Sequence, residues 1–235
     1  MRSTFVDGKA FLYLITMIAS ELVTQIFTPL RTSDSGEEAL TVMHVYHVKH
    51  MPIVNQKQLL GTISEEDILN QDMDEPIGSY GLSLVSAYVG MDAHLFEIMA
   101  KMAEYHLTTI PVLGQDDEYM GAITQESLIL FYAETFSFKE PGSIIVLEMA
   151  KRDYSLAEIS RIIESEGVAI LISFLTTDSD SQKVFVTLKL NTQDVQRAIT
   201  TLRRHEYHIR ASFSEEAYFE GLKERYDSLM SYLNV

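Results

Sequence analysis

The first half of the chain contains one pattern of apolar and polar positions twice. In residues 32–70, apolar side chains at helical spacing are followed by a short apolar strand, a polar turn, a second strand and the start of another helix. Residues 91–132 repeat this order in register with one extra residue in the second turn, and Pro52 of the first copy corresponds to Pro111 of the second. A tandem repeat of this size predicts two units packed about a pseudo-twofold axis.

Each copy contains a strand end that runs directly into a helix start. Residues 61–67 read Gly-Thr-Ile-Ser-Glu-Glu-Asp, so Ser64 can be the N-cap and Asp67 has the spacing of a capping box. The same turn is also a candidate anion site, because unpaired N–H groups and the helix dipole converge there, and Asp67 would then accept from a neutral diol. In the second copy Thr124 keeps the cap and Ser127 replaces the aspartate. The architecture therefore does not require Asp67.

A different pattern begins after residue 142. It predicts, in order, a strand at 144–147, a helix at 156–163, a strand at 168–175, a turn at 178–181, a strand at 184–190, a helix at 195–202 and a strand at 207–213. This βαββαβ order indicates a ferredoxin-like sheet with two helices on one face. An acidic amphipathic helix is expected after it, with Tyr218, Leu222, Tyr226 and Leu229 as its apolar face, docked on its own domain or on a partner subunit.

These patterns predict a mixed α+β protein with five parts. We expect a weakly ordered extension over residues 1–16, the two repeats over 17–75 and 76–138, the βαββαβ domain over 142–213 and the C-terminal helix over 214–235. The basic and apolar residues of the extension are also typical of a signal peptide, an alternative that would require cleavage inside the helical pattern that leads into the first repeat.

The two copies resemble a tandem pair of cystathionine-β-synthase-type (CBS) domains, also called a Bateman module. The resemblance rests on an apolar-Pro-apolar strand followed by Gly-apolar-apolar-Ser/Thr-x-x-Asp, present twice within residues 17–135, with Ser127 at the last position of the second copy. The C-terminal part resembles an ACT domain. The CBS resemblance implies a cleft between the repeats that binds an adenosine-containing ligand, commonly AMP, ADP, ATP or S-adenosylmethionine, and reports energy or metabolite status.

Carried over to this chain, the CBS ligand site would include Asp67, which would hold the ribose hydroxyls, and Ser64, which would donate to a phosphate. Family sites often have basic residues just before the apolar-Pro strand, and Lys49 and His50 occupy that place. Further candidates are Arg31 and Thr32 at a strand-to-helix junction, and Ile53 and Ile63 around the adenine, although core packing explains the two isoleucines equally well.

The second copy lacks the charges of the first. Thr108 and Thr109 stand where the first copy has Lys49 and His50, and the aspartate is also missing. The resemblance therefore implies one competent nucleotide site and one degraded site.

The ACT resemblance raises the question of amino-acid binding. ACT domains often bind amino acids through a loop after the first strand that carries a glycine, because only glycine lets the backbone approach so closely. Here residues 151–155 read Lys-Arg-Asp-Tyr-Ser, without glycine. We therefore expect a dimerising or interface-forming domain, with an amino-acid sensor as the alternative.

Composition and charge exclude several classes of function. The 235 residues carry a formal net charge of −16, which argues against a sequence-independent grip on nucleic acid or on an acidic membrane surface. The chain has no cysteine, so disulfides, thiolate metal sites and cysteine nucleophiles are excluded, which fits a reducing cytoplasm.

His44, His47 and His50 form a series that could suggest a metal site. No acid is placed by sequence to complete a ligand set, and histidines near a helix C-terminus are favoured by the helix dipole. We therefore expect no metal site.

No motif places a nucleophile, a base and an oxyanion donor together, so we expect no enzyme. The leading hypothesis is a cytoplasmic, homodimeric regulatory module that binds an adenine nucleotide, requires no cofactor and signals to an unidentified protein target. The alternative is a ligand-free assembly scaffold.

Overall fold

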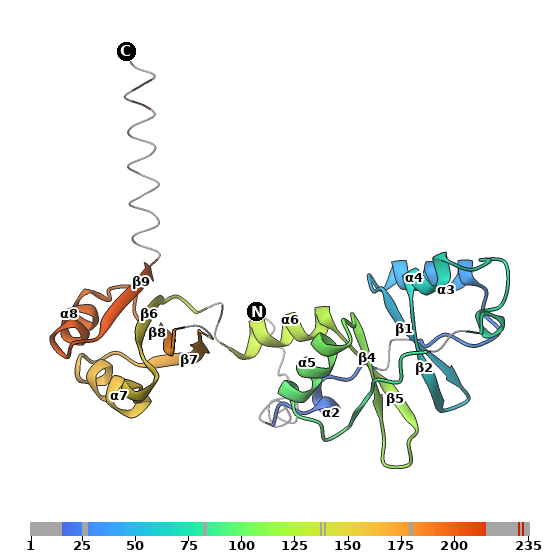
Figure 1. Cartoon of the computed structure of the whole chain (residues 1–235), viewed down its shortest axis with the longest axis horizontal. Coiled ribbons are helices and arrows are strands. Elements are labelled where there is room, and N and C mark those ends of the chain that lie inside the picture. The colour runs from blue at the N-terminus through green and yellow to red at the C-terminus, as the bar shows by residue number, and fades with distance from the viewer. Residues whose placement is uncertain are drawn as a thin grey trace, which may run out of the picture. The chain divides into compact units, whose positions relative to one another are not determined.

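The computed structural model describes residues 16–24, 28–81, 84–136, 138, 140–178, 181–214, 230 and 232. The chain divides into two compact units, Met1–Tyr132 and Ala133–Val235 (Figure 1). The proposed extension and the proposed C-terminal helix lie almost wholly outside the described residues. Within the described part of the chain, none of the helices has the length and apolar character needed to cross a bilayer.

The first unit contains the two repeats in the predicted order. Along the chain α2 (Ala19–Leu22) comes first, and its residues Ala19 and Ser20 hydrogen-bond to Ala93 and Met91 of the second repeat. The elements of the first repeat are α3 (Gly36–Val45), β1 (His50–Asn55), β2 (Gln58–Ser64), α4 (Glu65–Leu69) and the 3-10 turn η1 (Ile77–Ser79). The elements of the second are β3 (Val89–Gly90), α5 (Leu95–Glu104), β4 (Thr109–Leu113), β5 (Tyr119–Thr124) and α6 (Gln125–Thr135). In both repeats a parallel segment lies beside the hairpin, through Leu30 with Ile53 and through Val89 with Val112.

The two repeats exchange edge segments. Thr24, which leads into the first repeat, pairs antiparallel with Ala122 of the second, and Val85, which leads into the second repeat, pairs with Thr62 of the first. The exchange is reciprocal, as the predicted pseudo-twofold arrangement requires. Each hairpin therefore gains an edge partner from the chain that enters the other repeat.

Gly61 and Gly121 allow these segments to cross the hairpins. Both glycines have positive φ, +149° and +143°. A Cβ on Gly121 would stand 2.6 Å from the Thr24 carbonyl oxygen, and one on Gly61 would stand 2.5 Å from the Leu84 Cβ. The glycine of each copy is thus required by the close approach of the exchanged segment.

The core of the first repeat lies between the hairpin and the helices. Its buried side chains are Leu30, Ala39, Met43, Val48, Met51, Ile53, Ile63, Ile68 and Ile77, joined by Ala122 from the second repeat. β1 is buried on both faces from Met51 to Val54, which explains its continuous apolar run.

The C-terminal unit has the predicted βαββαβ order. Its elements are β6 (Ser143–Ala150), the 3-10 turn η2 (Lys151–Asp153), α7 (Leu156–Ser165), β7 (Ile170–Thr177), β8 (Lys183–Leu190), α8 (Gln196–Arg204) and β9 (His208–Ser214). The strands form one antiparallel sheet in the order β7-β8-β6-β9. Alternate residues of β6 and β8 pack with α7 and α8 in one core, so both helices cover the same face of the sheet. The predicted ferredoxin-like domain is confirmed, and in Figure 1 it is drawn in yellow to red.

Candidate functional site

The helix start at Ser64 forms the predicted capping box. The Asp67 backbone N–H donates to Ser64 Oγ at 3.0 Å, and the Ser64 backbone N–H donates to Asp67 Oδ2 at 3.0 Å. The Ser64 hydroxyl donates to the same Oδ2 at 2.6 Å. Asp67 Oδ1 makes no hydrogen bond to any other residue that the structure describes, so one oxygen of this half-buried carboxylate can accept from a ligand.

Several backbone donors of this turn, which the sequence predicts to be an anion site, already have partners. The Glu65 N–H donates to the Lys49 carbonyl at 2.8 Å, and the N–H groups of Ser64 and Asp67 are used within the capping box. The first turn also holds three carboxylates, which repel an anion. A phosphate could accept a hydrogen bond from the Ser64 hydroxyl only if that hydroxyl no longer donated to Asp67. The expected phosphate contact of Ser64 therefore stays a prediction.

Lys49 and His50 meet the second repeat at Thr108. The Lys49 backbone N–H donates to Thr108 Oγ1 at 2.9 Å, and the Thr108 backbone N–H donates to His50 Nδ1 at 3.2 Å. β1 and β4 also contact each other. Because His50 pairs with Ser64 in the hairpin, these contacts bring Thr108 to the end of β1 where the capping box lies. The candidate site thus lies at the boundary between the repeats.

His50 does not supply the cation that the sequence suggested. Burial lowers its pKa below the ordinary value of 6.5; nearby Asp67 opposes this shift, and Lys49 adds to it. Its Nδ1 also accepts a backbone N–H, which requires that nitrogen to be unprotonated. Near neutral pH the exposed Lys49 side chain is therefore the cation of this candidate site.

The second repeat keeps the cap and lacks the charge. The Ser127 N–H donates to Thr124 Oγ1 at 3.0 Å, and the Thr124 N–H donates to Ser127 Oγ at 3.1 Å. The geometry is that of the first repeat with a hydroxyl in place of the carboxylate. A capping box at this position therefore forms without an acid.

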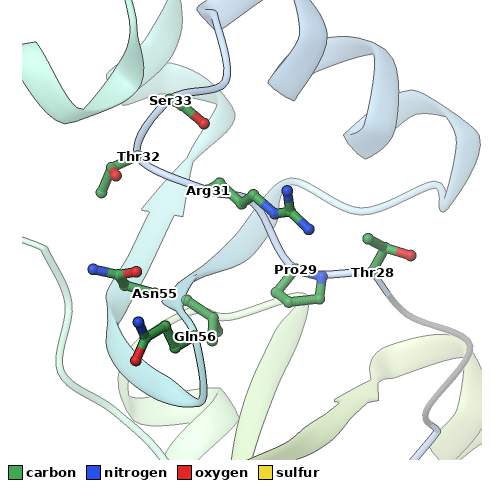
Figure 2. A pocket seen from close by; sticks show the side chains of 8 residues that line it. Thr28, Pro29, Arg31, Thr32, Ser33, Asn55 and Gln56 are labelled. Atoms are coloured by element: carbon green, nitrogen blue, oxygen red, sulfur yellow. The ribbon is translucent and has the colours of Figure 1, made fainter.

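The remaining candidates lie elsewhere in the first repeat. Ile53 and Ile63 are buried in the core cluster, so core packing accounts for both. Arg31 and Thr32 line a pocket of about 430 Å³ with Thr28, Ser33, Asn55 and Gln56 (Figure 2). The sequence analysis did not single out Thr28, Ser33, Asn55 or Gln56 as site residues. Asn55 and Gln56 come close to Arg31 only because the segment at Leu30 pairs with β1.

His47 is explained by backbone geometry. It follows the C-cap of α3 and has φ +53°, and His106 has the same φ after α5. Histidine is one of the residues that tolerate this left-handed conformation. Among the described residues no group of three or more histidines or acids is arranged to hold a metal ion.

The C-terminal unit has its own polar features. Glu148 lies between Lys183 of β8 and the β9 residues His208 and Arg210, and the hydrogen bond from Lys183 is the main cause of its lowered pKa. A pocket of about 340 Å³ at this end of β6 has four carboxylates in its lining, those of Glu148, Asp153, Glu158 and Glu206. The loop after β6 is the glycine-free turn η2.

The CBS domain family matches residues 19–74 and 84–134. Residues 19–134 of this chain are therefore a tandem pair of CBS domains, as the sequence indicated.

Proteins similar to part of this chain include the following three. Homoserine O-acetyltransferase of Methanococcus vannielii is 25% identical over 124 residues, which are 49% of this chain and 25% of that protein. The chain thus spans about a quarter of the length of this curated relative. A CBS domain pair/ACT domain protein from Thermotoga maritima is 21% identical with a TM-score of 0.45, over 50% of this chain and 98% of that one. CBSX2, solved in complex with AMP, is 18% identical with a TM-score of 0.42, over 48% of this chain and 93% of that one.

Proposed function

We propose that the CBS pair is a non-catalytic regulatory module that binds one adenine nucleotide at the boundary between its repeats, beside Asp67. CBS pairs are commonly regulatory modules that bind adenine nucleotides. The observation that carries the proposal is that Lys49 and His50 hydrogen-bond with Thr108 of the other repeat at the end of β1 that pairs with Ser64 of the capping box.

The groups at this place suit a nucleoside phosphate. The free Oδ1 of Asp67 can accept from the two hydroxyls of a ribose, and Lys49 can pair with a phosphate. Since Thr108 comes from the second repeat, a ligand here would contact both repeats. At the positions that match Lys49, His50 and Asp67, the second repeat has Thr108, Thr109 and Ser127, none of which is charged, so we expect no second nucleotide there.

Regulation would follow from contact with both repeats. A ligand shifts an equilibrium between two arrangements only if it binds one of them better than the other. We expect bound nucleotide to favour one packing of the repeats, and the ACT-like unit of a homodimer to pass this change to a protein target.

Thermal unfolding with candidate ligands tests the proposal. We expect millimolar AMP, ADP, ATP or S-adenosylmethionine to raise the Tm of the full chain, because a ligand at a hundred times its Kd stabilises the folded protein by about 2.7 kcal/mol. Adenine-free compounds of the same charge, such as pyrophosphate, serve as the control. An unchanged Tm with all four ligands would favour an assembly scaffold without a nucleotide.

A further inference from the structure

The pocket that contains Arg31 has a lining unlike the rest of this acidic chain. Its polar side chains are one guanidinium, three hydroxyls from Thr28, Thr32 and Ser33, and two carboxamides from Asn55 and Gln56, while Pro29 and Val54 supply apolar surface. Figure 2 shows the labelled side chains coming from two segments, the stretch before α3 and the end of β1 with the turn that follows it. The lining includes no carboxylate, although the chain as a whole has a formal net charge of −16.

Arg31 is available to a ligand. Its side chain forms no ion pair with another residue in the described ranges, and its backbone N–H donates to Asp34 Oδ2 at 2.8 Å. Other pockets among the described residues include at least one carboxylate in their linings, such as the one bounded by Asp116, Asp117 and Glu118. A guanidinium that lines the same pocket as hydroxyl and amide groups is suited to a phosphate or a carboxylate.

The segment that carries Arg31 is held firmly on both sides. The Leu30 N–H donates to the Pro52 carbonyl at 2.9 Å, and the Val54 N–H donates to the Leu30 carbonyl at 2.8 Å. Three residues after Thr32, the capping box of Ser35 and Glu38 fixes the start of α3. The pocket is thus built on backbone whose position is set before any ligand arrives.

The second repeat lacks the polar side chains that line this pocket. Because Leu30 and Val89 occupy the same place beside the two hairpins, Arg31 corresponds to Gly90. In the same alignment the second repeat has Met91 and Gly114 where the first has Thr32 and Asn55. The shared fold therefore does not require an arginine or a carboxamide at these positions.

We propose that this pocket binds an oxyanion, a phosphate or a carboxylate, carried by a small hydroxylated metabolite. Its volume of about 430 Å³ lies within the range of small-molecule sites. The pocket is distinct from the nucleotide site, because His50 and Asn55 lie at opposite ends of β1 and are about 16 Å apart at the usual rise per residue. The proposal goes beyond the nucleotide function and does not rest on it.

Calorimetry on the full chain at constant ionic strength tests this site. The probes are ribose 5-phosphate, citrate and unphosphorylated ribose, and NMR of the labelled chain locates any bound probe through the amide signals of Thr32, Ser33 and Asn55. We expect ribose 5-phosphate, citrate or both to bind saturably and ribose not to bind. The anion that binds identifies the group that the pocket accepts.

Three variants separate this site from charge effects and from the nucleotide site. R31Q should weaken anion binding at least tenfold, whereas R152Q, which removes an exposed guanidinium from the other unit, should not change it. D67A should also leave anion binding unchanged. The proposal is overturned if neither anion saturates, if R31Q binds like the unaltered chain, or if R152Q loses as much affinity as R31Q. An equal loss of AMP binding in R31Q and D67A would assign Arg31 to the nucleotide site and also overturn it.

Discussion

The two CBS repeats start their last helix with the same capping device, but only the first places a carboxylate in it. Ser64 with Asp67 and Thr124 with Ser127 make equivalent backbone hydrogen bonds within 0.1 Å of one another in length. Capping needs a hydroxyl and a short polar partner three residues later, and serine meets the second requirement as well as aspartate does. The fold therefore does not require the charge of Asp67. It also does not require the charge of Lys49, whose counterpart in the second repeat is Thr108.

Substitution of the paired glycines should have the largest effect and should show how alike the repeats are. We expect Gly61→Ala and Gly121→Ala each to lower the free energy of unfolding by about 2–5 kcal/mol, through an unfavourable positive φ and a clash with the exchanged segment. Urea denaturation of the full chain measures both. Gly81→Ala is the matched control, because Gly81 also has positive φ but a Cβ there meets nothing within 4 Å. If only one of the two substitutions lowered the free energy of unfolding, the two glycines would not have equivalent roles in the two repeats.

Substitution of Asp67 and of Ser127 should show that the two repeats differ in nucleotide binding. Asp67→Ala should weaken nucleotide binding ten- to a hundredfold, about 1.4–2.7 kcal/mol, because it removes a charged acceptor for the ribose hydroxyls. Ser127→Ala should leave the affinity unchanged. Calorimetric titration with the nucleotide that raises the Tm measures the affinity of both variants. Equal losses of affinity would show that the nucleotide site has been assigned to the wrong cleft.

The paired histidines that follow α3 and α5 should respond alike and in the stabilising direction. His47→Gly and His106→Gly should each raise the free energy of unfolding by about 0.5–1 kcal/mol, since glycine adopts the left-handed conformation without a Cβ penalty. His44→Gly, inside α3, should destabilise by about 1 kcal/mol because glycine is a poor helix former. Thermal unfolding at pH 8 keeps histidine titration out of the measurement.

The pH dependence of stability should show the smallest difference between the repeats. The pKa of His50 is lowered in the folded state, so the folded chain binds fewer protons than the unfolded chain just below pH 6.5. The contribution of neutral His50 is complete above pH 6.5 and is lost as the pH falls through the lowered pKa. Tm measured between pH 8 and 5 should therefore fall less steeply for His50→Gln than for the unaltered chain, while Thr109→Ser, at the matching position, should keep the original slope.

The sequence by itself determined the elements and their repetition. Helix and strand patterns, the turn residues and the three-residue spacing from Ser64 to Asp67 are local, so physical rules of short range are enough to predict them. The same holds for the βαββαβ order of the C-terminal unit, where alternate apolar residues of β8 are buried as the pattern indicated.

The tertiary structure decided what those elements do to one another. His50 and Thr108 are 58 residues apart, and only the packing of the repeats makes them partners and leaves His50 neutral. The pairing of Leu30 with Ile53 brings Arg31 to the turn at Asn55, and the Thr24 carbonyl makes Gly121 necessary. Residue types and spacings specify local geometry, whereas burial, pKa shifts and pocket linings depend on which distant segments meet, and no local pattern records that.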